Sequence, residues 1–318
     1  MGPVRFVSQT TASAKRPGLG LLSATAAVLV WGVSSVAIKQ VPELNGLGVA
    51  CYRIWLGAVV VTAVFLLSGG RLSWSMLRRS LFGGLTFTAD LVLFFVAVRE
   101  TSIANATVIG ALQPLLVLAV GSRLFGERAR AAEVGWGAVA VAGTVIVVLG
   151  GDGGGARSLY GDVLAVGALV SWTAYFVFTK AARRHLTAFE YLTGMAIVAA
   201  VAVVPLPLVF EGTLRGTDAS GWLIIAYLTT INGLLGHFLM AFAHGHVTLL
   251  TVSLLTLAIP VGAAAGAALW IDEPLTPLQV AGMAVVLAAL ALVTLSTARR
   301  SPDLAAADLE AIEAAPHP

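Results

Sequence analysis

The sequence has few charged residues and almost no cysteine. Only 11% of its 318 residues are Asp, Glu, Lys or Arg, whereas about 25% is usual for a soluble domain. Hydrophobic residues make up 58% of the chain, and the mean hydropathy is +0.93. The single cysteine, Cys51, cannot form an intrachain disulfide and is too isolated for a thiolate metal site. This composition excludes an ordinary soluble protein and predicts an integral membrane protein.

Motifs for nucleotide chemistry and catalysis are also missing. The chain has no GxxxxGK[ST] phosphate loop, which argues against ATP-driven transport by this chain alone. It has neither an HExxH nor a GxSxG motif, so we expect no cofactor and no metal site. The net charge of +3 does not indicate nucleic-acid binding, because membrane orientation accounts for the basic residues, as described below.

Ten apolar stretches are long enough to be membrane-spanning helices. They cover residues 20–40, 46–68, 80–98, 102–122, 134–150, 160–180, 190–210, 219–243, 248–270 and 277–297. A helical span needs about 20 apolar residues, and a helix satisfies its own backbone hydrogen bonds in lipid. Strands of a membrane barrel are shorter and alternate apolar with polar residues. We therefore predict an all-α integral membrane protein with ten transmembrane helices.

The positively charged residues predict how these spans are oriented. Fourteen of the nineteen Lys and Arg residues fall on one side of the ten spans, four fall on the other side, and Arg53 lies inside a span. Cytoplasmic loops are enriched in Lys and Arg, so both termini should be cytoplasmic, in a multi-pass protein of the bacterial inner (plasma) membrane. Residues 1–18 then form a basic cytoplasmic tail, and residues 299–318 form a disordered cytoplasmic tail.

The two halves of the chain share residue spacings. The matched pairs are Trp31–Lys39 with Trp172–Lys180, eight residues apart, and Pro114–Glu127 with Pro260–Glu273, thirteen residues apart. Each half has five predicted spans, so the second half enters the membrane from the opposite side. We therefore predict two inverted five-helix repeats, 19–150 and 159–298, joined by a Gly-rich extracytoplasmic linker over 151–158. Such repeats support alternating access around one site near the middle of the membrane.

In these features the chain resembles the drug/metabolite transporter superfamily and its EamA-type branch of ten-helix permeases. The resemblance extends over about residues 20–297. It rests on ten spans combined with Trp31, Gly32, Lys39, Arg53, Pro114, Gly126, Glu127 and the segment from Trp172 to Lys180. The family's usual Gly-Glu after the ninth helix is replaced by Asp272-Glu273, a mild departure. The resemblance implies a central cavity made mainly by the first four helices of each half, and transport, commonly export, of amino acids or other small metabolites.

Two ionisable residues fall deep inside predicted spans. An intramembrane charge costs about 2.5 to 3.5 kcal/mol on insertion scales, so both Asp90 and Arg53 need a compensating role. One interpretation is a buried ion pair between them that fixes helix packing. The other is a functional site, in which Asp90 binds a proton or a substrate amine and Arg53 binds a substrate carboxylate. The sequence leaves both interpretations open.

Aromatic and polar side chains predict the lining of a cavity. On the first span Trp31 and Ser34 share a helical face, and Trp172 and Tyr175 occupy the equivalent face of the sixth span. Phe94 lies one turn from Asp90. Interfacial anchoring is the alternative for the tryptophans, but both lie midway along their spans. We therefore expect cavity lining.

Further candidates lie in the fourth, eighth and ninth spans. The polar ones are Asn105, Gln113, Asn232 and His237. An amide in lipid either bonds a neighbouring helix or contacts a substrate, and His237 is either a packing histidine or a group that titrates near neutral pH. Pro114 and Pro260 interrupt backbone hydrogen bonding, so they produce either static kinks or gates.

From these features we expect a secondary transporter, specifically an exporter of a small metabolite such as an amino acid or an amphipathic compound. Protons are a candidate coupling ion, and Asp90 is the candidate coupling residue. Two alternatives from other classes are a membrane-embedded enzyme that acts on a lipid-linked substrate with Asp90 and His237 as acid and base, and a channel or sensor. The sequence does not indicate the oligomeric state.

Overall fold

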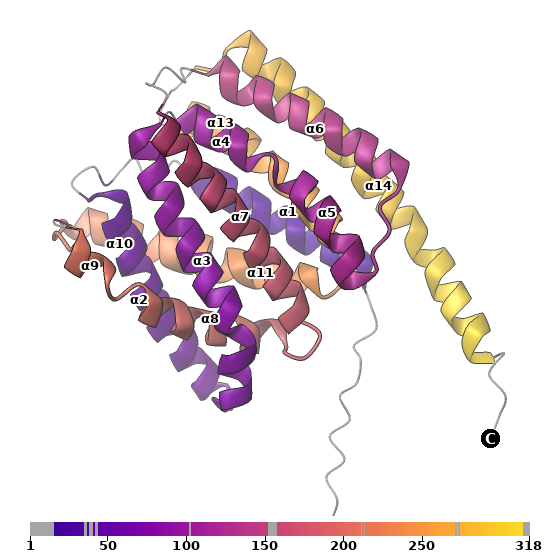
Figure 1. Ribbon diagram of the computed structural model, residues 1–318, viewed down its shortest axis with the longest axis horizontal. Helices are drawn as coiled ribbons and strands as arrows, with labels where there is room; N and C mark the ends of the chain where they lie inside the picture. The colour runs from indigo at the N-terminus through magenta and orange to yellow at the C-terminus, as the bar shows by residue number, and fades with distance from the viewer. Residues whose placement is uncertain are drawn as a thin grey trace, which may run out of the picture.

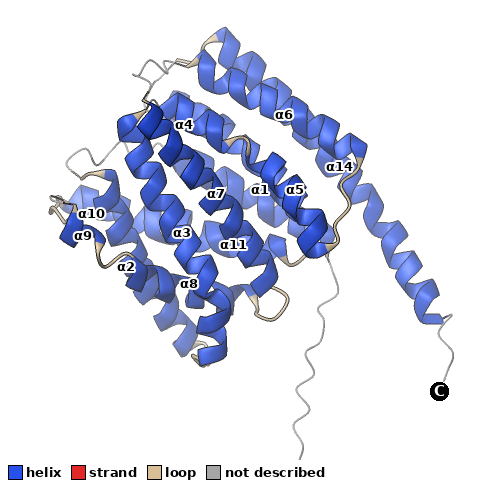
Figure 2. Cartoon of the chain, viewed as in Figure 1, coloured by secondary structure: helices blue, strands red, loops and turns tan. Residues whose placement is uncertain are grey.

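The computed structural model describes residues 16–34, 37, 41, 44–101, 103–151, 158–210, 212, 214–270, 272 and 274–313. Within these ranges every regular element is a helix and none is a strand (Figure 2). Eight of the described helices are long and apolar enough to cross a membrane, and Pro17–Gly32 forms a shorter apolar helix. The prediction of an all-α membrane protein is confirmed. The number of ten spans and the cytoplasmic location of both termini stay predictions.

The described residues of the first half form six helices. They are α1 (Pro17–Ser34), α2 (Gly46–Leu67), α3 (Trp74–Glu100), α4 (Ile103–Gly110), α5 (Gln113–Phe125) and α6 (Ala131–Gly150). Side-chain caps fix two of the starts, because Asn45 accepts a hydrogen bond from the Gly48 amide and Ser73 accepts one from the Met76 amide. The predicted fourth span is broken between α4 and α5, and Pro114 lies in the first turn of α5. Proline is tolerated there because the first turn needs no amide donor.

The second half has the same kind of broken helices. Its elements are α7 (Leu159–Ala182), α8 (Ala188–Ala202), α9 (Leu206–Val209), α10 (Ala219–Tyr227), the π-helix η2 (Leu228–Leu235), α11 (Gly236–His244), α12 (Leu249–Leu255), the 3₁₀ turn η3 (Thr256–Ala258), α13 (Ile259–Trp270) and α14 (Pro277–Glu313). Pro260 follows η3, as Pro114 follows the break in the first half. At the start of α10 the amide of Gly221 and the hydroxyl of Ser220 hydrogen-bond to Asp218 and lower its pKa.

Helices of the two halves pack against one another throughout the bundle. α3 packs mainly on α7 and α8, α1 packs on α11 and α13, and α6 lies along α14 at one edge of the bundle (Figure 1). Each of these pairs joins the first half of the chain to the second. Tyr175, Tyr191, Phe176 and Met240, on α7, α8 and α11, are among the largest fully buried side chains. Because α3 and α1 pack on these helices, the two halves share an extensive interface.

α14 continues past residue 298, where the predicted cytoplasmic tail begins. The helix runs through Pro302 to Glu313 and projects beyond the bundle (Figure 1). This part of the sequence contains Leu304 and three consecutive alanines, 305–307, followed by Leu309 and Glu310. Alanine, leucine and glutamate have high helix propensity, which accounts for a helical backbone here. Disorder of the tail over 299–318 stays a prediction.

Candidate functional site

A cavity lies between helices of the two halves. Its volume is about 50 Å³, and its walls come from α2, α3, α8 and the η2–α11 segment. The lining residues are Arg53, Ile54, Gly57, Ala58, Phe87, Leu91, Leu192, Met195, Ala196, Ala199, Thr229, Gly233, Leu234 and His237. Among these described residues Arg53 is the one with a permanent charge, and most of the others are apolar. Such a lining suits a small ligand with an apolar body and few polar groups.

Arg53 is held at the cavity by the π-helix of the second half. Its Nη2 donates a hydrogen bond to Oδ1 of Asn232, in the middle of η2. The backbone oxygen of Asn232 accepts a second hydrogen bond from Nε1 of Trp31 at 3.1 Å. Asn232 therefore joins α1 and α2 of the first half to η2. Short π-helical segments are rare and occur frequently at functional sites.

Five ring side chains form an aromatic cluster beside the cavity. His237 is its centre, with ring centroids 4.8 Å from Phe87, 5.0 Å from Trp31 and 5.8 Å from Tyr175. The Tyr175 hydroxyl lies 3.0 Å from Nδ1 of His237, and Trp31 contacts Trp172 edge to face at 5.6 Å. Phe87 and His237 reach the cavity wall, while the other three rings pack behind them. The structure thus brings together four of the residues that sequence analysis selected.

Asp90 and Arg53 do not form an ion pair in the described structure. Arg53 binds Asn232 instead, so the interpretation as a buried Arg–Asp pair does not hold. Asp90 is partly buried on α3, outside the cavity lining and within electrostatic range of Tyr175. Phe94 packs against a small cluster of alanines from α3, α4 and α7, also away from the cavity. Asp90 and Arg53 therefore occupy separate environments.

The two amides of the fourth span make contacts between helices. Nδ2 of Asn105 donates to Oδ1 of Asp162 and connects α4 to α7. Oε1 of Gln113 accepts a hydrogen bond from the Ser253 hydroxyl at 3.0 Å and connects α5 to α12. Gln113 is almost completely buried. Both contacts match the packing alternative given above, and neither residue lines the cavity.

Three other residues from the sequence analysis have no described side chain. Ser34 is the last residue of α1, but its side chain lies outside the described part of the chain. Lys39 and Glu273, the repeat partners of Lys180 and Glu127, also lie outside it.

Sequence analysis missed much of the cavity wall. Phe87 is three residues from Asp90, so helical spacing would have placed it near the same face of α3. Leu192 and Met195 of α8 gave no such signal, because an apolar side chain that faces a cavity has the same composition as one that faces lipid. Thr229 also lines the cavity, but its hydroxyl donates to the backbone oxygen of Ile225 at 2.7 Å.

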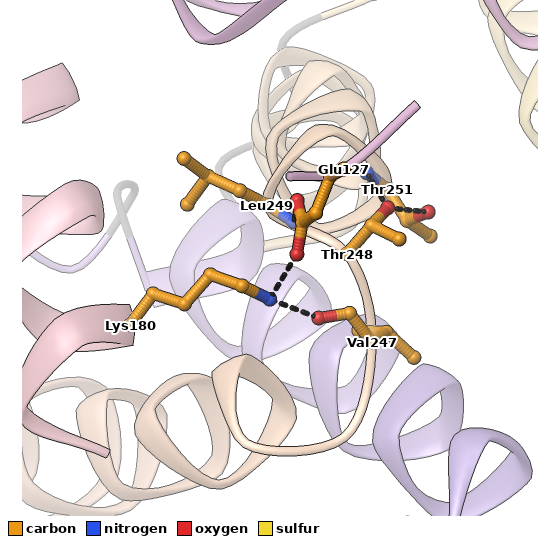
Figure 3. Close-up of polar contacts among 6 residues, drawn as sticks. All are labelled: Glu127, Lys180, Val247, Thr248, Leu249 and Thr251. Atoms are coloured by element: carbon orange, nitrogen blue, oxygen red, sulfur yellow. Dashed lines mark hydrogen bonds and ion pairs between the residues drawn. The ribbon is translucent and has the colours of Figure 1, made fainter. Parts of the chain in front are cut away.

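A second polar site joins the two halves near the ends of α5, α7 and α11 (Figure 3). We call it the 127–180 cluster; it consists of Glu127, Lys180, Val247 and Leu249. Nζ of Lys180 lies 2.7 Å from Oε1 of Glu127 and donates to the backbone oxygen of Val247 at 2.6 Å. The Leu249 amide donates to the other Glu127 oxygen at 2.7 Å. A carboxylate of the first half is thus bound by two segments of the second half.

Local backbone structure places this carboxylate. Gly126 ends α5 in the left-handed region, with φ of 68°, which glycine adopts without strain. The next residue, Glu127, then meets the first amide of α12, where the helix dipole favours negative charge. Thr248 caps the same helix by accepting a hydrogen bond from the Thr251 amide at 3.1 Å (Figure 3). The Glu127 and Lys180 side chains are only 18% and 12% exposed, so solvent screens their interaction weakly.

The sequence matches one family model twice, as expected for a repeated chain. The EamA-like transporter family is matched over residues 18–149 and again over 159–295. Among curated proteins, a "Probable amino-acid metabolite efflux pump" of Escherichia coli (strain K12) is 26% identical over 275 residues, which cover 83% of this chain and 90% of that protein. The "Threonine/homoserine exporter RhtA" of Salmonella typhimurium (strain SL1344) is 25% identical over 283 residues, covering 87% and 91% of the two chains.

The fold also matches a protein of known structure. One solved crystal structure superposes with a TM-score of 0.76 and 21% sequence identity. The superposition covers 88% of this chain and 98% of the other. At this identity the similarity shows a common fold and carries no information about the substrate.

Proposed function

Because the chain belongs to the EamA-like transporter family, we propose that it is a secondary transporter that exports a small metabolite across the bacterial plasma membrane. The family and the relatives are transporters and efflux pumps, so this chain is a membrane transporter rather than an enzyme. The proposal includes ten spans, two inverted repeats and cytoplasmic termini, as the charge distribution predicts.

The observation that carries the proposal is the position of the cavity. α2 and α3 of the first half and α8, η2 and α11 of the second half form its walls. A site at the interface of two repeats is exposed alternately to the two sides of the membrane when one repeat moves against the other. The cavity is therefore where we propose that the substrate binds.

The 127–180 cluster supports closure of the cytoplasmic side. Glu127, Lys180 and the start of α12 all lie at helix ends that the charge distribution assigns to the cytoplasm. Their contacts hold the first half against the second at that end. We propose that these contacts break when the cavity opens toward the cytoplasm to load a substrate, and form again when it opens outward.

The identity of the substrate is proposed only at the level of its size and chemistry. The names of two relatives specify amino-acid metabolites and threonine or homoserine. The cavity of this chain has a mainly apolar wall with one cation. We therefore propose a small amphipathic metabolite, and we propose protons as the coupling ion, with Asp90 as the group that binds them.

Comparison of culture media tests the export function. Cells that express the wild-type chain, a Trp31→Ala variant or no transporter are grown to equal density, with the membrane abundance of the two proteins matched. We expect at least one metabolite to accumulate in the medium of wild-type cells only, because Trp31 supports both Asn232 and the aromatic cluster. An Arg78→Gln variant, changed at an exposed position of α3, should behave as wild type. Identical media from all strains would contradict export of any metabolite that these cells produce.

A further inference from the structure

We propose that Arg53 binds the carboxylate of the substrate, so that the transported class is an organic monoanion with an apolar body. This inference rests on the transporter function proposed above. It goes beyond that function because it states which part of the substrate the cavity recognises.

Arg53 is a partly buried cation for which the described residues provide no counter-charge. Charged side chains inside a membrane protein are paired with each other or with backbone oxygens. In the part of the chain that the structure describes, no carboxylate lies within ion-pairing distance of Arg53, and its hydrogen-bond partner is the neutral amide of Asn232. A guanidinium carries five N–H donors, and one amide oxygen satisfies few of them. An anion from outside the protein would supply the missing charge.

Arg53 also lines the cavity. Its Nη2 lies beside the backbone of Gly233, where a Cβ atom would be 4.0 Å away, and binds Asn232. Among the described residues Nε and Nη1 have no hydrogen-bond partner, which leaves these donors for a ligand in the cavity.

The polar groups of the wall bear on the charge of the ligand. Other polar groups of the wall are already engaged, since Thr229 donates to Ile225 and His237 is bonded to Tyr175. One guanidinium matches one carboxylate in a bidentate arrangement, whereas a phosphate dianion needs further donors. No acidic residue is among the described lining residues, so the wall offers no counter-charge for an ammonium group. The chemistry favours a monoanion over a zwitterion or a cation.

The apolar residues of the wall bear on the body of the ligand. The apolar part of the wall includes Leu91 on α3 and Leu192, Met195 and Ala199 on α8. A flexible methionine among leucines accommodates apolar groups of different shapes. A branched or aromatic hydrocarbon would fill this region.

Equilibrium dialysis with the purified full-length protein in detergent tests the proposal directly. The probes share one hydrocarbon body and differ in their polar group: 3-phenylpropanoate, 3-phenylpropanamide, 3-phenylpropylamine and phenylalanine. We expect the carboxylate to bind wild type at least about tenfold more tightly than the amide or the amine, because a hydrogen bond between charged groups is stronger than a neutral one. Phenylalanine should also bind at least about tenfold more weakly than the carboxylate, because its ammonium group would lie in the cavity without a counter-charge.

Variants of the cation provide the second measurement. Arg53→Gln should reduce carboxylate binding by at least about tenfold and leave amide binding unchanged, while Arg53→Lys should retain part of the preference. Arg78→Gln, at an exposed position, is the matched control for loss of one positive charge. The wild-type comparison of carboxylate with amide decides the question even where Arg53→Gln does not fold.

Equal affinity for carboxylate and amide, unchanged carboxylate binding in Arg53→Gln, or no binding of any probe to wild type would overturn the proposal. These results would leave the transporter function standing, because binding in detergent does not depend on transport. Transport of a neutral or cationic metabolite by the same protein in vesicles would then show that only the substrate class was wrong. A failure of transport with intact carboxylate binding would affect the proposed function instead.

Discussion

At the scale of single residues, Asn232 has a central position because it contacts both Arg53 and Trp31. Its side-chain oxygen accepts from the guanidinium, and its backbone oxygen accepts from the indole nitrogen. The neutral amide orients Arg53 without cancelling its charge. A carboxylate at the same place would orient the guanidinium and neutralise it as well.

The Asn232→Asp variant tests whether neutralising Arg53 weakens carboxylate binding. It preserves the shape of the side chain but provides an internal anion for Arg53. We expect the protein to fold with unchanged or higher melting temperature and to lose at least about tenfold in affinity for 3-phenylpropanoate. Thr229→Ser, a conservative change elsewhere on the cavity wall, serves as control. Full carboxylate affinity in the Asp variant would contradict the role given to Arg53.

Asp90 is the candidate for proton coupling, and Asp90→Asn tests it. The amide occupies nearly the same volume as the carboxyl group but cannot take up or release a proton. Asp90 has no ion pair in the described structure that this change would break, so we expect normal abundance in the membrane. Transport rate measured from pH 5.5 to 8 in vesicles should lose the pH dependence that wild type shows. An unchanged pH profile at equal abundance would exclude Asp90 as the coupling residue.

Several residues that the sequence singled out because their chemistry is unusual in an apolar span lie near one another in the structure, while their role in binding a substrate stays a prediction. Arg53, Trp31, Tyr175 and His237 stand out in apolar spans, and they gather at one place. Leu192 and similar wall residues do not stand out. Which polar groups bind each other was also unpredictable, because spacing along one helix does not determine which neighbouring helix it faces.

At the scale of helices, the close approach of α1 and α13 depends on glycine. A Cβ atom on Gly32 would lie 2.9 Å from the Cα atom of Gly262 and 2.9 Å from the backbone oxygen of Ile259. Both are backbone atoms, which cannot move aside as a flexible side chain can. Small residues allow helices in a membrane to approach this closely.

The Gly32→Ala variant should therefore push α1 away from α13. We expect it to lose about 1 to 3 kcal/mol of stability, as is usual when a packed contact is overfilled, and to show a lower melting temperature in detergent. Gly110→Ala in α4 is the matched control, because no atom lies within 4 Å of the added methyl group. A Gly32→Ala protein as stable as the control would show that the two helices are not in tight contact.

The positions of the helices could be predicted from hydropathy. Only some of the breaks inside the helices could be predicted from the sequence. The expected span 46–68 agrees closely with α2 (Gly46–Leu67), since both ends are marked by polar residues. α3 begins at Trp74, six residues before the expected start, because its first turns contain arginines that were assigned to a loop. Prolines indicated the breaks of the fourth and ninth spans. The π-helix η2 had no such signal, because hydropathy does not report the backbone hydrogen-bonding pattern.

At the scale of the whole molecule, the halves meet both at the cavity and at the 127–180 cluster. Beside the cavity they are joined by the hydrogen bonds of Arg53 and Trp31 to Asn232. At the cluster they are joined by the ion pair between Glu127 and Lys180 and by the hydrogen bond from the Leu249 amide to Glu127. A balance between outward-open and inward-open forms should therefore depend on the cluster. Loss of one charged contact worth about 1 kcal/mol changes the ratio of two states about fivefold.

A reporter cysteine can measure this change. Cys51 is the chain's one cysteine and is buried, so a Cys51→Ala protein is a cysteine-free background. The reporter is Ser253→Cys, which lies on α12 one helical turn after Leu249 of the cluster. In membrane vesicles whose cytoplasmic face is accessible to the reagent, Glu127→Gln or Lys180→Met should increase the rate at which a membrane-impermeant maleimide labels the reporter cysteine about fivefold or more. Arg128→Gln, an exposed neighbour, should leave the rate unchanged. Equal rates in all variants would mean that the cluster does not hold the cytoplasmic side closed.

We propose that the cavity between the repeats carries a metabolite by alternating access, and a counterflow measurement distinguishes this mechanism from a pore. Purified protein is reconstituted into vesicles loaded with an unlabelled metabolite identified from the culture media, and a trace of the labelled compound is added outside. Alternating access predicts a transient accumulation of label above equilibrium that saturates with concentration and is absent from Trp31→Ala vesicles. Label that enters in proportion to its concentration and never exceeds equilibrium would indicate a pore and would contradict the account.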